Sequence, residues 1–306
     1  MASLLPPIKA METQIRSIVL AGGKGTRLSP LTRGTPKQFW RPLGGASLIE
    51  QTLTRLAPIC SGDRTVVVVD ESQRQHLDSQ LIARARCRVV FQPTDRGTAA
   101  GVLFGLIAVL DADPQAMVLI TPADHGVRQP EVFRRGVVDA GAHVRVHDTV
   151  VLFGVEARSP QTDFGWITLA GTAASGDIRP VSGFVEKPSA DVAHQLFAAG
   201  AAWNTMVIVA RARALLDLFR AQIPDVACLF VGALTLRPST RTAFLASRYP
   251  RLPSRDFCRD VLAGAADLDA YLWPATVGWS DLGTPQRLTQ WFAAPAIAPS
   301  HSHSAT

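Results

Sequence analysis

The chain contains 306 residues with a mass of 32.8 kDa, and 47% of its residues are hydrophobic, which is enough to build one large domain or two small ones. The longest apolar runs, such as VVVV at 66–69, fall far short of the roughly 20 residues that span a bilayer, so we expect no membrane association. The formal net charge of +6 favours anionic ligands, but the arginines are spread along the chain, and we expect small phosphorylated ligands and no nucleic acid.

Cysteine and lysine usage narrows these expectations. The four cysteines are scattered without a C-x-x-C pair, which argues against a zinc site and favours a reducing, cytoplasmic location. Only four of the 31 basic residues are lysines, and two of them, Lys24 and Lys37, lie in one short stretch. An ammonium is a compact point charge that arginine does not replace where a phosphate is held at one spot. The stretch is therefore a candidate phosphate site, although chance explains any single lysine equally well.

Short β-branched runs bounded by turn residues predict strands, and apolar residues at helical spacing predict helices between them. In chain order we expect a strand at 15–21, a helix at 47–57, a strand at 65–70, a helix at 71–85, a strand at 87–91, a helix at 98–112, and strands at 117–121, 149–155 and 206–210. Strand and helix alternate through the first 140 residues. This alternation predicts an α/β fold with a doubly wound, mainly parallel (mixed) sheet that is covered on both faces.

The second half of the chain is less regular. Short strands and turns alternate with helices expected near 190–199, 211–221 and 254–263, as in the far wall of a cleft. No Pro/Gly/Ser-rich linker separates two domains, so we expect a single domain over 15–294, with halves at about 15–145 and 146–294. Residues 1–14 are expected to form a flexible leader, and the low-complexity residues 295–306 a disordered tail.

A glycine-rich stretch, AGGKGTRL, follows the first expected strand. In open α/β sheets this position meets phosphate, because the segment leaves the carboxyl end of a strand. Glycines at 22, 23 and 25 allow close approach of the backbone N–H groups to an anion, and Lys24, Arg27 and Lys37 supply charge. The spacing matches neither a P-loop nor a dinucleotide fingerprint. A structural turn is the alternative for the glycines alone.

The full pattern A-G-G-x-G-T-R-L-x-P-L-T, followed by P-K-Q-F, is much more specific, and at this point the sequence resembles the sugar-1-phosphate nucleotidyltransferases. Within them it is most similar to mannose-1-phosphate guanylyltransferases, and the resemblance covers most of residues 15–292. It implies a Rossmann-like nucleotidyltransferase fold with a sugar-binding lobe, a nucleotide half at about 15–145 and a sugar-binding half at about 146–294. It also implies that Arg27 and Lys37 engage the phosphates, and that the nucleotide is contacted by Leu20, Ala21, Gly22, Gly23, Gly25 and Thr26.

The segment FQPTDRGTAAG (91–101) resembles the base-reading segment R-N-T-A of guanylyl enzymes. The resemblance adds Gln92, Arg96, Gly97 and Thr98 to the nucleotide-binding residues. Gly97 stands where the family has asparagine, so the base stays open between guanine and others. Thr98 alternatively serves as a helix N-cap, and both roles are compatible.

Two aspartates are candidates for a metal site. Asp124 follows the apolar run MVLITP, and Asp281 lies in VGWSDLGTP; both match metal-binding aspartates of the resembling family. A hard cation that bridges phosphates prefers one or two carboxylates, so we expect Mg²⁺. Each aspartate alone is equally well explained as a turn residue or a helix cap. His125 is expected to pack or orient its neighbours.

Three short segments are similar to the family's sugar-binding elements. The resemblance implies that Lys187 in SGFVEKPSADVA holds the sugar phosphate, that Glu186 meets sugar hydroxyls, and that Asn204 in WNT contacts the sugar. DFGWI (163–167) resembles a sugar-side strand and adds Gly165. Met206 stands where glycine is usual, which leaves the identity of the hexose open. An exposed ion pair at a strand end is the alternative for Glu186 and Lys187.

These features together predict transfer of a guanylyl group from GTP to a hexose 1-phosphate, with mannose 1-phosphate as the first candidate, giving a GDP-sugar and pyrophosphate. Arg27, Lys37 and Lys187 are the expected catalytic cations. The attacking phosphate is already anionic at neutral pH, so no general base is needed. Alternatives are the same chemistry with heptose 1-phosphate and GTP or with glucose 1-phosphate and dTTP or UTP, or a catalytically silent nucleotide-sugar sensor. Whether the chain forms a homo-oligomer is open, and nothing after residue 295 predicts a further domain.

Overall fold

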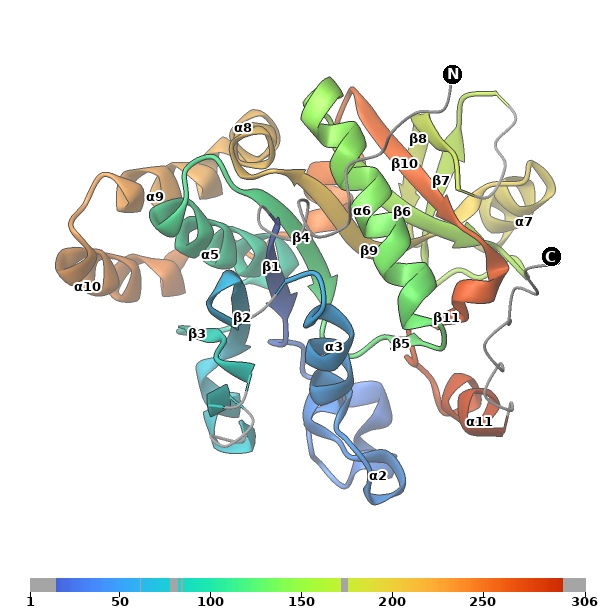
Figure 1. The fold of residues 1–306 in the computed structure, drawn as a ribbon, viewed down its shortest axis with the longest axis horizontal. Helices are drawn as coiled ribbons and strands as arrows, with labels where there is room; N and C mark the ends of the chain where they lie inside the picture. The colour runs from blue at the N-terminus through green and yellow to red at the C-terminus, as the bar shows by residue number, and fades with distance from the viewer. Residues whose placement is uncertain (1–14, 61, 78–81, 84, 172–175, 294–306) are drawn as a thin grey trace, which may run out of the picture.

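The computed structural model describes residues 15–293 except 61, 78–81, 84 and 172–175 (Figure 1). The strands are β1 (Ile15–Leu20), β2 (Thr65–Asp70), β3 (Arg88–Gln92), β4 (Met117–Pro122), β5 (Gly126–Val127), β6 (Val150–Glu156), β7 (Gly165–Leu169), β8 (Ile178–Glu186), β9 (Ala202–Arg211), β10 (Leu268–Trp273) and β11 (Trp279–Ser280). The α-helices are α2 (Ser29–Thr32), α3 (Leu48–Leu56), α5 (Gly97–Ala112), α6 (Pro130–His147), α7 (Ala190–Ala198), α8 (Ala212–Gln222), α9 (Pro224–Leu234), α10 (Pro238–Arg248) and α11 (Pro285–Ala293). The shorter helical turns are η1 (Thr26–Leu28), η2 (Lys37–Phe39), η3 (Pro42–Gly44), η4 (Gly62–Arg64), η5 (Glu71–His76), η6 (Tyr249–Arg251), η7 (Cys258–Leu262) and η8 (Ala275–Val277).

A nine-stranded sheet in the order β3-β2-β1-β4-β9-β6-β10-β8-β7 forms the centre of the molecule, and β11 pairs with β5 in a separate ribbon. The strands β1 to β4 pair in parallel, as do β6 and β10. The strand β9 runs antiparallel to β4, β6 and β7, and β8 runs antiparallel to β7 and β10. The expected α/β fold with a mixed sheet is confirmed, and its parallel pairs lie mainly where strand and helix alternate along the chain.

Two hydrophobic layers cover the two faces of the sheet, because successive strand residues point to opposite sides. On one face Ile18 and Val68 pack with α5, α8 and α9. On the other face Val19 and Val67 pack with α3 and α6. The helix α5 is buried at nearly every position from Ala99 to Leu110, since α8 and α9 cover the side that faces away from the sheet. Among the described residues no helix is both long and apolar enough to cross a membrane.

The sheet positions the functional loops at the carboxyl ends of adjacent strands. The register pairs Leu20 at the end of β1 with Pro122 at the end of β4, and the Ala123 amide donates to the Leu20 carbonyl over 2.9 Å. The amide of Ala21 donates to the Val68 carbonyl of β2 over 2.8 Å. The glycine-rich loop after β1 and the segment around Asp124 after β4 therefore leave the sheet side by side.

Two expected helices differ in the structure. The described part of 71–85 begins with the 3-10 turn Glu71–His76, in which only Gln73 is buried, so no apolar face stabilises a regular helix there. The helix expected at 254–263 is shorter: residues 254–256 run across the segment before α5, and the π-helix Cys258–Leu262 follows. The expected leader (1–14) and tail (295–306) lie outside the described residues.

Candidate functional site

The segment P-K-Q-F fastens the glycine-rich loop. The buried amide of Gln38 donates to the carbonyls of Ala21 over 2.6 Å and Gly23 over 2.9 Å. Gly25 has a φ of +60°, and a Cβ at this position would lie 2.9 Å from the Cβ of Lys37. Only glycine combines this backbone conformation with so close an approach. The two motifs therefore act as one unit, and Gln38 is a loop-fixing residue that the sequence analysis did not identify.

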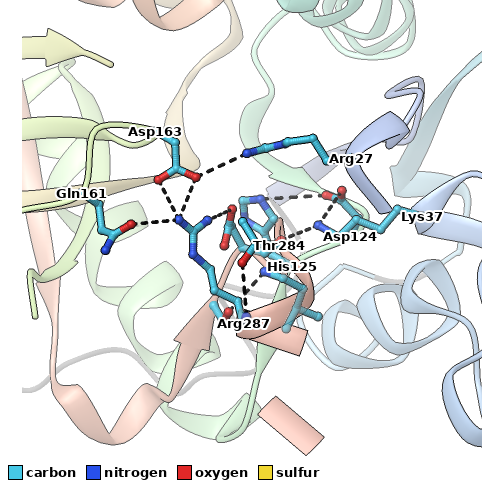
Figure 2. Close-up of polar contacts among 11 residues, drawn as sticks. Arg27, Lys37, Asp124, His125, Gln161, Asp163, Thr284 and Arg287 are labelled. Atoms are coloured by element: carbon cyan, nitrogen blue, oxygen red, sulfur yellow. Dashed lines mark hydrogen bonds and ion pairs between the residues drawn. The ribbon is translucent and has the colours of Figure 1, made fainter. Parts of the chain in front are cut away.

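Lys37 connects the two candidate metal-binding aspartates, Asp124 and Asp281. Its side chain is only 6% exposed, and its Nζ lies 3.0 Å from Oδ2 of Asp124 (Figure 2). The same Nζ donates to the main-chain carbonyl of Asp281, which is 244 residues further along the chain. Asp124 follows β4 and Asp281 follows β11, so three segments meet at one ammonium group. A buried lysine in this position needs both oxygen partners, because an unpaired buried charge is strongly unfavourable.

The protonation states at this point follow from burial and charge. Burial alone would raise the pKa of Asp124, but the neighbouring charges of Lys37 and His125 outweigh it and hold the pKa below its ordinary value. Burial lowers the pKa of His125 to about 4, and its ring lies edge-on to Trp279 with centroids 5.4 Å apart. Asp124 is therefore ionised and His125 neutral at neutral pH, which leaves the carboxylate and ammonium as the charged groups of this cluster.

The residues present fit a divalent cation. Asp281 binds Arg287 through Oδ2 at 2.7 Å, whereas its Oδ1 is buried and has no hydrogen-bond partner among the described residues. Asp124 directs Oδ2 to Lys37 and leaves Oδ1 3.9 Å from the His125 Nε2. In the described part of the chain no group of three or more Cys, His, Asp or Glu side chains forms a metal cluster. Two carboxylates with free oxygens suit a hard divalent cation, which prefers oxygen ligands.

A cavity of about 470 Å³ extends from this cluster over the glycine-rich loop. Of the expected nucleotide-binding residues it is lined by Leu20, Gly22, Gly23, Gln92, Gly97 and Thr98. Ala21 is buried below the loop, and the Arg96 guanidinium donates to the Pro250 carbonyl instead. The cavity wall also contains Asp256 and Arg259, which the sequence analysis did not identify because they come from the opposite half of the chain.

The structure gives a physical reason for Gly97. Its φ is +80°, and a Cβ there would lie 2.2 Å from the Arg255 carbonyl oxygen. That carbonyl accepts the Ala99 amide over 3.1 Å, and the Phe257 amide donates to Oγ1 of Thr98 over 2.8 Å. Residues 254–257 are thus fastened onto the start of α5 and form the wall of the cavity. A side chain at position 97 would separate these two segments.

Gly97→Ala is expected to lower the free energy of unfolding by more than about 2 kcal/mol, because it combines a positive φ with a backbone clash. Gly34→Ala is the matched control, since Gly34 also has a φ of +80° but its Cβ would meet nothing within 4 Å. Its cost should be about 1 kcal/mol. Urea unfolding of both variants measures the difference, and equal costs would show that the contact with Arg255 is unimportant.

The expected sugar-side residues lie together on β7, β8 and β9. Gly165 is paired with Glu186 in the sheet, and a Cβ on Gly165 would lie 2.6 Å from Oε2 of Glu186 and 3.3 Å from the Cβ of Asn204. Lys187 Nζ lies 3.2 Å from Oε1 of Glu186. Met206 lines the cavity and has a φ of +61°. The resembling family usually has glycine at this position, and the methionine here therefore has a strained backbone conformation.

Burial raises the pKa of Glu186 above its ordinary value of 4.5, more than the Lys187 charge lowers it. The ionised carboxylate therefore destabilises the fold above the raised pKa, and this cost disappears as the pH falls below 4.5. Glu186→Gln is expected to raise the Tm at pH 7 and to have little effect at pH 4. The control Glu71→Gln should not raise the Tm, because a hydrogen bond from Arg74 lowers the pKa of Glu71. Thermal unfolding at both pH values tests this.

Arg27 pairs with a carboxylate from the sugar-side half of the chain. Its exposed guanidinium lies 3.3 Å from Asp163, which precedes β7, and Asp163 binds Arg287 at 2.6 Å (Figure 2). The Lys187 amide donates to the Phe164 carbonyl over 3.1 Å, so residues 163–164 connect two of the three expected catalytic residues, Arg27 and Lys187. A larger cavity of about 810 Å³ borders Asp163 and Arg287. Asp163 lies in the quoted DFGWI segment but was not assigned a role, and Arg287 carried no sequence signal.

This combination of a mixed α/β sheet, a glycine-rich loop and a cluster of cations and carboxylates defines a phosphate-handling transferase fold. Residues 16–296 match the nucleotidyl transferase family, and the chain belongs to it. It is 30% identical to xanthan biosynthesis protein XanB of Xanthomonas campestris pv. campestris (strain B100), over 89% of this chain and 58% of that protein. It is 28% identical to a mannose-1-phosphate guanylyltransferase of Salmonella muenchen, over 87% of this chain and 57% of the relative. The chain thus spans less than two thirds of these relatives.

Solved structures agree with this assignment of the fold. A structure from Thermus thermophilus, described as a mannose-1-phosphate geranyltransferase, superposes with a TM-score of 0.78 at 28% identity, over 92% of this chain and 80% of that one. A UDP-glucose pyrophosphorylase from Acinetobacter baumannii superposes with a TM-score of 0.62 at 13% identity, over 90% of this chain and 91% of that one, which shows a shared fold only. The resemblance to sugar-1-phosphate nucleotidyltransferases is confirmed.

Proposed function

We propose that this chain transfers a guanylyl group from GTP to mannose 1-phosphate and releases pyrophosphate. The observation that carries the proposal is the convergence of Asp281 and Lys37 on Asp124, which lines a nucleotide-sized cavity. The relatives named as mannose-1-phosphate guanylyltransferases support the choice of substrates. We also propose that residues 15–294 form one catalytic domain that acts in the cytoplasm, in keeping with the four free cysteines.

The mechanism needs alignment and charge neutralisation more than proton transfer. The sugar phosphate oxygen that attacks the α-phosphorus is already anionic, and repulsion between two polyanions is the main obstacle. Lys37, fixed between the Asp124 carboxylate and the main-chain carbonyl of Asp281, neutralises phosphate charge, and Arg27 leaves Asp163 to bind the departing pyrophosphate. Lys187, at the end of β8, holds the sugar phosphate in line. Its exposed ammonium is free to turn from Glu186 toward the incoming anion.

Asp124 and Asp281 are the residues that would hold a divalent cation, which we propose to be Mg²⁺. When bound it supplies Lewis-acid neutralisation of the phosphate charge. The unpartnered Oδ1 of Asp281 and the free Oδ1 of Asp124 are the oxygens available to it. Lys37 contacts the Asp124 carboxylate and the Asp281 main-chain carbonyl, so the chain itself holds the two aspartates together.

One residue of the cavity, Gln92, is placed to contact the base of the nucleotide. Gln92 is buried and its Oε1 accepts the Tyr249 hydroxyl over 3.2 Å, so its amide nitrogen remains as a donor on the side of Gly22. A donor there fits the O6 carbonyl of guanine, but it equally fits the O4 carbonyl of uracil or thymine. The relatives named as guanylyltransferases, more than the cavity, therefore favour GTP.

A pyrophosphate-release assay across a panel of nucleotides and sugar phosphates tests the proposal. GTP with mannose 1-phosphate should give the highest kcat/KM, and turnover should require a divalent cation. Higher kcat/KM for UTP or dTTP with glucose 1-phosphate, or for heptose 1-phosphate with GTP, would replace the proposed substrates. Binding of nucleotide sugars without any turnover would identify a catalytically silent sensor instead.

A further inference from the structure

The guanidinium of Arg287 makes polar contacts with two segments outside α11, residues 161–163 and Asp281. From the first turn of α11 its guanidinium donates through Nη1 to Oδ2 of Asp281 at 2.7 Å and through Nη2 to Asp163 at 2.6 Å (Figure 2). A further bond from Nη2 reaches Oε1 of Gln161 over 3.2 Å, and the guanidinium lies 4.3 Å from the centre of the Phe164 ring. The side chain is 16% exposed. Its position is therefore fixed by two other segments, residues 161–164 and the loop that carries Asp281.

These contacts decide which oxygen of Asp281 is available. Arg287 occupies Oδ2, while Oδ1 is buried without a hydrogen-bond partner among the described residues. Without Arg287 the carboxylate could rotate, because Lys37 contacts only the main-chain carbonyl of Asp281. A carboxylate that must present one chosen oxygen to a ligand needs such a partner.

The same guanidinium connects this carboxylate to the sugar-side half. Asp163 and Phe164 precede β7, and the Phe164 carbonyl accepts the amide of Lys187. Asp163 also contacts Arg27 at 3.3 Å. A displacement of Arg287 would thus disturb the orientation of Asp281 and the placement of the two catalytic cations. Its two carboxylate partners, Asp163 and Asp281, lie on different segments, and the planar fork of arginine can hold both.

We infer that Arg287 is a positioning residue that fixes the Asp281 carboxylate, so that its Oδ1 is directed to the bound phosphate–metal group. The same side chain fixes the position of Asp281 relative to the sugar-side loop 161–164. The inference rests on the proposed function. Lysine at this position keeps the charge, but its single ammonium cannot reproduce the fork geometry. Arg287→Lys should therefore weaken the positioning of Asp281 while a positive charge still balances the carboxylates of Asp163 and Asp281.

The first test measures binding of Mn²⁺ together with pyrophosphate, the product that all nucleoside triphosphate substrates share, by titration calorimetry. Arg287→Lys is expected to weaken this binding by about 10- to 100-fold. The matched control is Arg158→Ala, which removes an exposed arginine that lines the same larger cavity, and it should stay within about twofold of the wild type. Binding by Arg287→Lys within twofold of the control would overturn the inference, as would a wild type that does not bind the pair.

The second test is a double-mutant cycle in kcat with Asp281→Asn. If Arg287 acts through Asp281, Arg287→Lys should lower kcat by about 10- to 100-fold in the wild type and by less than about threefold in the Asp281→Asn background. Equal losses in both backgrounds would mean that Arg287 has only a structural role. If the wild type binds Mn²⁺ and pyrophosphate, Arg287→Lys weakens that binding, and GDP-mannose is not formed, the proposed substrates fail while the inference on Arg287 stands.

Discussion

Asp124→Asn is expected to lower kcat for pyrophosphate release by on the order of 10³-fold, the largest effect of any substitution proposed for this chain. Loss of a carboxylate removes one ligand of the cation, a contribution of several kcal/mol to the transition state. It also deprives the ammonium of Lys37, 6% exposed, of its only carboxylate partner in the described structure. The loss should appear in kcat measured at saturating GTP and sugar phosphate, and it should not be recovered by more Mg²⁺.

The matched control for this prediction is Asp217→Asn, because Asp217 is an exposed carboxylate on α8 that pairs with Arg220. Its kcat should remain within about twofold of the wild type. An Asp124→Asn enzyme that is folded and retains more than a tenth of the wild-type kcat would rule out Asp124 as part of the reacting centre.

Lys187→Ala is expected to lower kcat/KM for the sugar phosphate by on the order of 10²–10³-fold, as for removal of one preorganised donor. Lys187 is 59% exposed and its nearest partner is Glu186, so the substitution should cost little stability. The KM for GTP should change by less than about threefold, because Lys187 lies on the sugar side. Steady-state kinetics with each substrate varied in turn separates the two effects.

Arg179→Ala controls for the loss of a positive charge from the same strand, since Arg179 lies on β8 and pairs with Asp177 at the surface. It should leave both kinetic constants within about twofold. Intact turnover and intact sugar-phosphate affinity in Lys187→Ala would show that this lysine is an ordinary strand-end ion pair.

The fold was predictable where a local pattern determines it. The alternation of strands and helices in the first half predicted parallel strands and helices on both faces of the sheet. Strands that are buried on both faces are recognised by their continuous apolar runs. The helix expected at 71–85 was wrong in its first part, where Glu71–His76 form a 3-10 turn with only Gln73 buried; residues 82, 83 and 85 are helical, and Ile82 and Ala85 pack against the core. The antiparallel return of β9 between β4 and β6 depends on pairings far apart in sequence, which local patterns do not contain.

The candidate site was predictable only where one segment carries the signal. The glycine-rich loop, Asp124 and Lys187 each stand in a distinctive local pattern, and their assignments remain proposals. Arg287 and Asp163 are 124 residues apart; Arg287 lies in no motif and Asp163 only opens the DFGWI segment, so their contact exists only through the fold. Gly97 and Met206 departed from the resembling family; the positive φ at 97 explains the glycine there, whereas the positive φ at 206 favours glycine and gives no structural reason for the methionine. The contact between position 97 and Arg255 was not visible in the sequence.

The most direct test of the central claim is anomalous diffraction from a crystal of the protein grown with Mn²⁺ and GTP. The account predicts one anomalous peak within coordination distance, roughly 2.0–2.5 Å, of carboxylate oxygens from both Asp124 and Asp281, with the triphosphate over the glycine-rich loop. A peak that touches neither aspartate, or a triphosphate bound away from Lys37, would contradict it.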